Sequence, residues 1–269
     1  MINSLSSAVS GLDAFQQQMD IIGNNIANIN TTGYKSATGN LADSFSDTLQ
    51  AATISTAGTT GDAMQVGTGV QTTSISNNWS TGTINPTNNS NDLAISGNGF
   101  FQVQDPSSGT AYVTQDGTFQ LNSQGDLMTT TNMSVMGSSG AIKFPMTNAA
   151  GAGLTNWTVN STGAITLTYS DGTTAAGGQI QLLNFTNPQA LVSAGDNLYT
   201  NMANAGSSAA ENPGSGGTGT VVQGSLELSN VDLSAQMASL IVAQRGFEAN
   251  SKIVTTSDEV LQDSVQMKR

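Results

Sequence analysis

Apolar residues near the start of the chain follow one another at alternating spacings of three and four. This is the heptad pattern of a helix that packs along a narrow seam against a second helix. The positions between the apolar residues carry mostly Ser, Gln, Asn, Asp and Gly. The pattern predicts a helix, with Gly33 as its stop. The seam consists of Leu5, Ala8, Leu12, Phe15, Met19, Ile22, Ile26 and Ile29.

The other end of the chain carries a matching seam, in which apolar residues recur every seven positions. Ser229 and Asp232 indicate where this second helix begins. The main row consists of Leu233, Leu240, Phe247, Val254 and Leu261, and Ile241, Ile253, Val260 and Met267 widen the apolar side. A companion row is only partly apolar and consists of Met237, Gln244, Ser251, Asp258 and Val265. Its polar members predict looser packing.

The segment that follows the first helix has weaker signals. Leu41, Phe45 and Leu49 are spaced by four, which is compatible with a short amphipathic helix within residues 34–50. Residues 51–69 show no period and contain several glycines, which is typical of a long loop. From residue 70 onward the pattern changes, since residues 70–76 are rich in Thr, Val and Ile and predict a strand.

The middle of the chain is dominated by β-signals. Residues 93–103 contain two apolar runs joined by Gly97-Asn98-Gly99, which predicts a hairpin. Residues 156–169 predict a second hairpin. Three short runs joined by Gly-containing turns predict a meander, and they are 112–114, 118–121 and 126–129. Further strands are predicted at 179–186 and at 221–228, which leads to the C-terminal helix.

Together these patterns predict an α+β fold. Both termini form one discontinuous α-helical coiled-coil module, and an all-β, sandwich- or barrel-like central domain is inserted between them. The predicted helical module is 1–33 and 229–269, the extended linker with a loop and the first strands is 34–85, and the central domain is 86–228.

The composition excludes several classes of function. The net charge is −12 with six basic residues, so nucleic acid is not an expected partner. The absence of Cys and His excludes structural zinc and both Cys–His and Ser–His–Asp catalysis. Acidic pairs such as Asp43 with Asp47 are interpreted as solvated helix faces. We therefore predict no catalytic residue, metal site or cofactor. No run of 18 apolar residues exists, so no membrane insertion is expected.

No basic residue precedes Lys35, and no early apolar run is long enough for the core of a signal peptide. If the protein leaves the cell, it is therefore expected to do so without a cleaved signal peptide.

Four groups of motifs, in order along the whole chain, resemble the signatures of bacterial flagellar rod and hook proteins. The first is Ile22-Gly23-Asn24-Asn25-Ile26-Ala27-Asn28 followed by Thr32-Gly33-Tyr34-Lys35. The second is Asp92-Leu93-Ala94-Ile95 with Gly97-Asn98-Gly99-Phe100-Phe101, and the third is Gly195-Asp196-Asn197-Leu198-Tyr199. The last is Ser229-Asn230-Val231-Asp232-Leu233 with Ile241-Val242-Ala243-Gln244-Arg245-Gly246-Phe247 and Asn250-Ser251-Lys252. One position departs from the family pattern, because Gln115 stands where the family often has Arg.

Within this family the chain is most similar to the short hook proteins of Gram-positive bacteria, and the distal rod proteins are the alternative. The resemblance implies a homopolymer in the form of a helical tube, located outside the cell in the hook or basal body of the flagellum. A hook would act as a universal joint between rod and filament. The implied partners are the flagellar type III export apparatus and the hook cap, distal rod and hook–filament junction proteins. A secreted β-rich adhesin is a weaker reading, since only 5% of the residues are aromatic.

Seams at both termini, with β-structure between them, favour assembly between copies over packing within one chain. The predicted polymerisation interface consists of Leu5, Leu12, Phe15, Met19, Ile22, Asn25, Ile26, Ile29, Leu233, Met237, Leu240, Gln244, Phe247, Val254 and Leu261. Arg245 and Lys252 are seven apart and share one helix face. They are either exposed to solvent or form ion pairs with Asp13 or Asp20 of a neighbouring copy.

Overall fold

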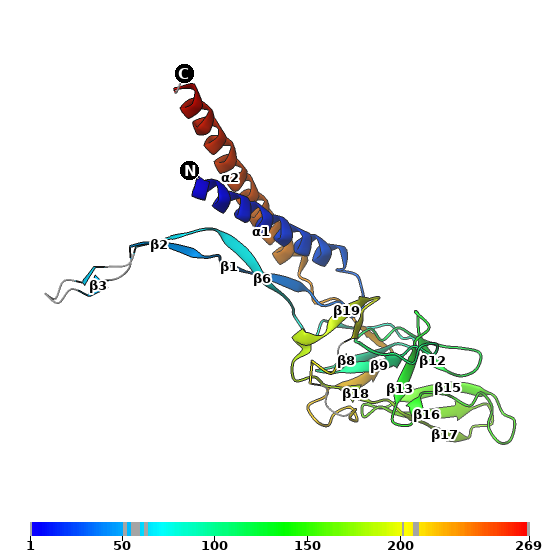
Figure 1. The fold of residues 1–269 in the computed structure, drawn as a ribbon. Helices are drawn as coiled ribbons and strands as arrows, with labels where there is room; N and C mark the ends of the chain where they lie inside the picture. The colour runs from blue at the N-terminus through cyan, green and yellow to red at the C-terminus, as the bar shows by residue number, and fades with distance from the viewer. Residues whose placement is uncertain are drawn as a thin grey trace. The chain divides into compact units, whose positions relative to one another are not determined.

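The computed structural model describes residues 2–50, 53–54, 60–61, 64–200, 202–206 and 210–267. It has an α+β fold with helices toward both termini and a β-rich region between them (Figure 1). The chain divides into two units. Unit 1 comprises Met1–Ala27, Ala37–Asn77 and Val231–Arg269, and unit 2 comprises Asn28–Ser36 and Asn78–Asn230.

Unit 1 contains the two long helices, α1 (Ile2–Ala27) and α2 (Leu233–Gln266). Helix α1 ends before the predicted stop, so Ile29 lies in a turn beyond the helix and in unit 2. Helix α2 is capped by Asp232, whose carboxylate accepts hydrogen bonds from the backbone N–H groups of Ser234 and Ala235. An Asp directly before the first helical residue can reach these otherwise unpaired donors, which explains why the helix begins there.

The rest of unit 1 is a two-stranded antiparallel ribbon. Strand β1 (Ala37–Asp43) pairs with β6 (Val70–Asn77), and β2 (Ser46–Gln50) pairs with β5 (Met64–Gly67). Strand β3 (Thr53–Ile54) pairs with β4 (Thr60–Gly61).

The ribbon corrects two expectations. A short helix within residues 34–50 is wrong, and described parts of the expected 51–69 loop are strands. The predicted strand at 70–76 is confirmed. That strand supplies the backbone partners that hold residues 37–43 in extended form, and a local spacing of four cannot reveal a partner so distant in sequence.

Unit 2 is built around a sheet that has nine strands among the described residues. Its path runs β11 (Phe119–Leu121), β12 (Leu127–Thr129), β13 (Ser134–Gly137), β9 (Phe100–Gln104), β10 (Ala111–Thr114), β20 (Leu198–Thr200) and β19 (Val192–Gly195). Strand β14 (Gly140–Ala141) pairs with β13, and β18 (Leu182–Leu183) pairs with β9. A short 3-10 helix, η1 (Pro188–Ala190), precedes β19.

Smaller sheets complete unit 2. Strands β15 (Leu154–Val159), β16 (Ala164–Tyr169) and β17 (Thr174–Gln179) form an antiparallel sheet, so the predicted hairpin at 156–169 is confirmed. Strand β7 (Ile84–Pro86) pairs with β22 (Ser225–Glu227), and β8 (Leu93–Ser96) pairs with β21 (Thr220–Gln223). The strand predicted at 221–228 is thus split into two at Gly224.

The predicted hairpin at 93–103 is wrong, because β8 pairs with β21 whereas β9 belongs to the large sheet. Gly97 and Gly99 take left-handed φ values of 117° and 144° and carry the chain from one sheet to the other. The predicted meander is also only partly right. Strands β11 and β12 pair as expected, but β10 pairs with β9 and β20 instead.

The core of unit 2 joins its sheets. Its largest fully buried side chains come from several of them, and Phe101 and Phe119 meet edge to face with ring centroids 5.1 Å apart. A second cluster contains Phe100, Phe185 and Tyr199, with Trp79 packed against it. Burial, with a smaller effect of nearby Tyr34, raises the pKa of Tyr199 to about 12, so this phenol stays neutral inside the cluster.

A buried ion pair holds together the segments at the two ends of unit 2. The Lys35 ammonium lies 2.6 Å from a Glu227 carboxylate oxygen, and both side chains are almost fully buried, with 1% and 2% exposed. Lys35 also donates to the Ser80 carbonyl at 3.0 Å, and Glu227 accepts from the Gly82 N–H at 2.7 Å. We name these residues the clasp. Because each charge has further hydrogen-bond partners, the cost of burying the pair is offset.

The amide of Asn230 continues this arrangement. Its oxygen accepts from the Ser36 N–H at 2.8 Å, and its nitrogen donates to the Asn78 carbonyl at 2.8 Å. Asn78 in turn donates its backbone N–H to the Ser36 carbonyl at 2.8 Å. The three segments by which the chain enters and leaves unit 2 are therefore bound to one another.

Gln115, the residue that departs from the family pattern, is buried in the same unit. Its nitrogen donates to the Gly99 carbonyl at 3.0 Å, and its buried side-chain oxygen has no partner among the described residues. Nearby Gly33 must be glycine, because its φ is +67° and an added Cβ would lie 2.8 Å from the backbone nitrogen of Asp116.

The first prediction concerns the clasp. Replacing Lys35 by Met leaves the Glu227 charge buried without its counter-ion, and we expect the unfolding free energy to fall by about 3–5 kcal/mol. The control is Lys143→Met, since Lys143 pairs with Asp126 at the surface, with 61% of the lysine side chain exposed. That change should cost less than about 1 kcal/mol. Urea denaturation of the full chain measures both, and equal costs would contradict the assignment.

Candidate assembly surface

Helices α1 and α2 pack antiparallel within unit 1, as the contacts between them establish. An added Cβ on Gly11 would collide with the Asn250 amide, and one on Gly246 would lie 2.5 Å from the Phe15 ring. Moving along α1 toward its start therefore means moving along α2 toward its end. The two backbones approach closely because glycines occupy both contact points, and the aromatic ring of Phe15 fits over one of them.

Asn25 connects three elements of unit 1 and is only 1% exposed. Its amide nitrogen donates to the Ala37 carbonyl at the start of β1 (2.8 Å) and to the Gln236 side-chain oxygen on α2 (3.2 Å). Its amide oxygen accepts from the Ala37 N–H at 2.9 Å. Asn25 was expected at an interface between copies, but its side chain is used and enclosed within its own chain.

The predicted seam of α1 lies mostly toward the interior of unit 1. Ile22 is buried, and the other apolar seam residues of this helix are partly buried, namely Leu5, Leu12, Phe15, Met19 and Ile26. Small Ala8 and Ala14 are buried between them. The seam of α1 therefore already has partners within its own chain.

The predicted seam of α2 divides into an inner and an outer part. Leu240, Phe247 and Val254 are partly buried and alternate with Ala243 and Asn250, which also face inward. The remaining predicted positions are exposed, and they are Leu233, Met237, Gln244 and Leu261. Small and polar side chains gain less from leaving water, so a pattern of large apolar residues does not reveal these inner positions.

Large apolar side chains remain exposed on α2. Ile241 is 58% exposed and Val242 is 68% exposed, although both follow directly on the partly buried Leu240. Toward the end of the helix the exposed apolar residues are Ile253, Val260, Leu261, Val265 and Met267. Helix α2 has 34 residues and α1 has 26, and in unit 1 the end of α2 extends past the start of α1 (Figure 1). The last turns of α2 thus lack the cover that α1 provides further back.

The ribbon adds apolar surface that the sequence patterns did not indicate. Phe45, between β1 and β2, is 84% exposed, and Ile75 on β6 is 61% exposed. A two-stranded ribbon is only marginally stable by itself, so its support comes from α1. Ser10 of α1 accepts a hydrogen bond from the Val70 N–H at 3.2 Å. Of this ribbon the sequence predicts only the strand at residues 70–76, from their β-branched composition.

The charged residues predicted for the interface lie at the surface of unit 1. Arg245 forms an ion pair at 2.8 Å with Glu248 on its own helix, and 77% of its side chain is exposed. Asp13, Asp20 and Lys252 are exposed, and no ion pair among the described residues includes any of them. Pairing of these residues between copies therefore stays a prediction.

The described part of the chain contains no group of three acidic side chains that could hold a metal ion. Neither of its long helices is sufficiently apolar over enough residues to cross a lipid bilayer. What distinguishes unit 1 is its surface, which combines exposed apolar side chains on α2 and the ribbon with isolated charges.

Three family models match the chain, one at each end and one in the middle. "Flagella basal body rod protein" matches residues 5–35. "Flagellar hook protein FlgE/F/G D1 domain" matches residues 94–167. "Flagellar basal body rod FlgEFG protein C-terminal" matches residues 222–267. The matches at the ends include most of α1 and α2, where the candidate surface lies.

Similar proteins align over the full length. The flagellar basal-body rod protein FlgG of Bacillus subtilis is 42% identical over 274 residues, covering 100% of both chains. FlgG of Borreliella burgdorferi is 34% identical over 272 residues, again with 100% of both chains covered. The flagellar hook protein FlgE of Borreliella burgdorferi is 40% identical over 113 residues, which are 42% of this chain and 26% of that protein.

The second prediction tests the close approach of the helices. Gly246→Ala puts a methyl group 2.5 Å from the Phe15 ring, so the ring or one helix must shift, and we expect a loss of about 1–3 kcal/mol in stability. The matched control is Gly23→Ala in α1, where an added Cβ has no atom within 4 Å. That variant should gain about 0.5–1 kcal/mol from better helix propensity. Thermal unfolding followed by circular dichroism distinguishes the two, and a gain in both would refute the packing.

Proposed function

Because the chain belongs to the family of flagellar basal-body rod and hook proteins, we propose that it is a subunit of the distal rod. Members of this family are structural proteins of the flagellum, so the chain is a structural subunit and not an enzyme. In this role copies of the chain assemble into a tube that transmits rotation. A rod is a rigid tube, whereas a hook is a tube that bends.

We prefer the rod to the hook, although the sequence motifs alone favour the hook. Relatives named as basal-body rod proteins align with the whole chain from end to end. The hook relative aligns with less than half of this chain and about a quarter of its own length. Agreement in total length supports one shared arrangement of helices, ribbon and β-unit, whereas a partial match reflects only the shared parts.

The observation that carries assembly is the exposed apolar surface of α2. The helix turns one apolar side toward α1 and leaves Ile241, Val242 and Val260 exposed on the outside. Each such side chain gains about 1.5–3 kcal/mol when it is fully buried. A monomer cannot obtain this gain, but neighbouring copies can provide the cover. Several large apolar side chains exposed on one helix indicate a site of protein association.

In the proposed polymer, α1 and α2 of neighbouring copies supercoil as a helical inner layer, and the seam residues Leu233, Met237 and Leu261 are covered there. The exposed end of α2 beyond the start of α1 fits this arrangement, because a neighbour's helix can continue the packing where α1 ends. The ribbon, with Phe45 exposed, supplies a further contact.

The partners follow from the same proposal. The chain binds other copies of itself and adjoins further flagellar components, among which we include the hook and the type III export apparatus. Its location is the flagellar basal body.

The third prediction tests the apolar surface. Val242→Asp places a charge at a side chain that is 68% exposed, so the free chain should keep its helix content and stability. A buried, unpaired charge between copies is costly, so rods should fail to form. Thr255→Asp adds the same charge at an exposed polar position on α2 and serves as the control. Swimming and electron microscopy of basal bodies give the result, and normal rods with Val242→Asp would exclude this surface.

The fourth prediction separates rod from hook. Gold-labelled antibody to residues 86–228, applied to intact flagella with basal bodies, should bind the straight shaft in detergent-opened envelopes. Label on the curved segment outside the envelope would identify a hook protein and overturn the rod proposal. Flagella without label at either place would overturn both.

A further inference from the structure

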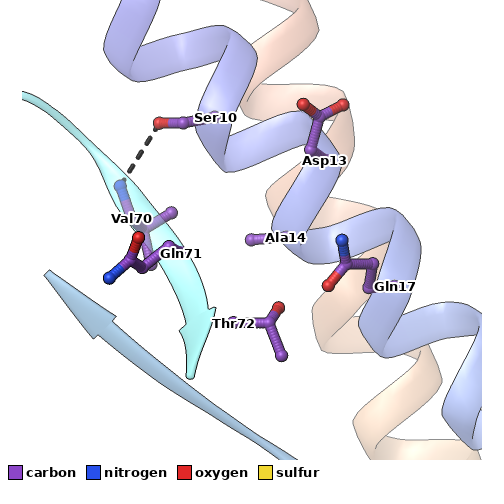
Figure 2. Close-up of a pocket in the computed structure, with 7 residues that line it drawn as sticks. All are labelled: Ser10, Asp13, Ala14, Gln17, Val70, Gln71 and Thr72. Carbon is purple, nitrogen blue, oxygen red and sulfur yellow. Dashed lines mark hydrogen bonds between the residues drawn. The ribbon is translucent and has the colours of Figure 1, made fainter. Parts of the chain in front are cut away.

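A polar pocket lies between helix α1 and strand β6 inside unit 1 (Figure 2). It encloses about 270 Å³, many times the volume of about 30 Å³ that one water molecule takes in the liquid. Ser10, Asp13 and Gln17 line it from the helix. Val70, Gln71 and Thr72 line it from the strand, and Ala14 adds a methyl group from the helix. The pocket can therefore admit a side chain.

The hydroxyl group of Thr72 has unused hydrogen-bonding capacity. Its oxygen is buried, and no described residue forms a hydrogen bond with it. The Ser10 hydroxyl is engaged elsewhere, since it donates to the Ser7 carbonyl at 2.9 Å and accepts from the Val70 N–H. A buried polar group without a partner costs about 1–3 kcal/mol, and such groups are rare in native proteins. Since this oxygen has almost no accessible surface, the Thr72 side chain must rotate toward the pocket before a hydrogen-bond donor from outside this chain can remove the cost.

The side of the pocket on α1 offers further acceptors. Asp13 and Gln17 are exposed, and among the described residues neither side chain forms an ion pair or hydrogen bond. Together with Thr72 they provide a carboxylate, an amide oxygen and a hydroxyl oxygen. An ammonium group matches this set, because it is a compact cation with three donors and no acceptor.

Among the residues that the structure describes, one cation is suitable. It has six Lys and Arg residues, and Lys35, Lys143 and Arg245 each form an ion pair within the chain. Lys268 and Arg269 lie outside the described residues. Lys252 is exposed on α2, and no ion pair of the described part of the chain includes it. In a chain with a net charge of −12, a cation of this kind is a scarce and specific partner.

Lys252 cannot easily reach the pocket of its own chain. Asn250 faces α1, where it lies against Gly11. Two further residues turn about 200° around an α-helix, so Lys252 lies on the side of α2 that faces away from α1. The donor that enters the pocket must then come from another copy.

We infer that the pocket formed by Asp13, Gln17 and Thr72 receives the ammonium group of Lys252 from a neighbouring copy. This inference rests on the proposed assembly into a rod. The pocket and the lysine are two different surfaces of one chain, so the contact is head-to-tail. Contacts of this kind produce open helical polymers when the rotation between copies does not close a ring, as a rod requires.

The fifth prediction uses the absence of cysteine in the chain. Two variants, Asp13→Cys and Lys252→Cys, are produced together in cells that lack the unmodified chain. A short bis-maleimide reagent, whose span replaces the lysine stem, is applied to isolated basal bodies. We expect crosslinked dimers that contain one chain of each variant. Since each chain has a single thiol, such a dimer must join two copies.

The control pairs Asp20→Cys with Lys252→Cys, because Asp20 lies seven residues along α1 and does not line the pocket. Rods that assemble but crosslink no better through Asp13 than through Asp20 would overturn the inference and leave the rod function intact. If antibody to residues 86–228 finds no rod that contains the chain in cells producing the unmodified protein, the proposed function itself fails.

The variant Thr72→Val tests the same pocket independently, since it removes the hydroxyl group with little change in side-chain shape. The free chain should unfold at the same urea concentration or a higher one, because an unpaired buried hydroxyl is lost. Release of the chain from isolated rods should shift to lower urea, because the bond to Lys252 of the neighbouring copy is lost. Unchanged release would mean that only water occupies the pocket, and the inference would be wrong.

Discussion

Unit 1 depends on the buried amide of Asn25, because this one side chain joins the end of α1 to the start of β1 and to α2. Its hydrogen bonds to Ala37 fix where the chain turns back as a ribbon, and its bond to Gln236 fixes the level at which α2 passes. Ten residues closer to the start of α1 and ten residues closer to the end of α2, Phe15 lies over Gly246. One polar anchor therefore sets the register, and small residues then allow the helices to approach closely.

The close approach of α1 and α2 determines which side chains of α2 remain at the surface. The inner side of α2 needs small or polar residues such as Ala243 and Asn250, because a large side chain would separate the helices. Large apolar residues such as Val242 are then carried on faces that the chain itself does not cover. The monomer thus places small side chains at the closest contacts, beside the partly buried Leu240 and Phe247, and leaves further apolar side chains where only a binding partner can cover them. Assembly is the way to recover that hydrophobic free energy.

The sequence predicts where helices and strands form better than it predicts which segments they pair with. The two terminal helices follow from periodicity, and the strand at 70–76 and the hairpin at 156–169 follow from local composition, because all these signals depend only on near neighbours. The pairing of β8 with β21, and that of Lys35 with Glu227, join residues more than a hundred positions apart. No local pattern contains that information. The pocket around Thr72 cannot be predicted from a local pattern for the same reason, since it forms only where a helix and a strand lie side by side.

The surface of unit 1 combines two kinds of contact that do different things. Apolar contact is non-directional, so residues such as Val242 can supply affinity but cannot by themselves select one position of a neighbour. A charged donor that must meet a carboxylate and a buried hydroxyl is directional, and a displacement of one helical turn would leave it without these partners. A shaft that transmits torque needs copies that do not slip past one another. A single lysine held in the pocket of Asp13 and Thr72 would fix the register that the apolar surface leaves open.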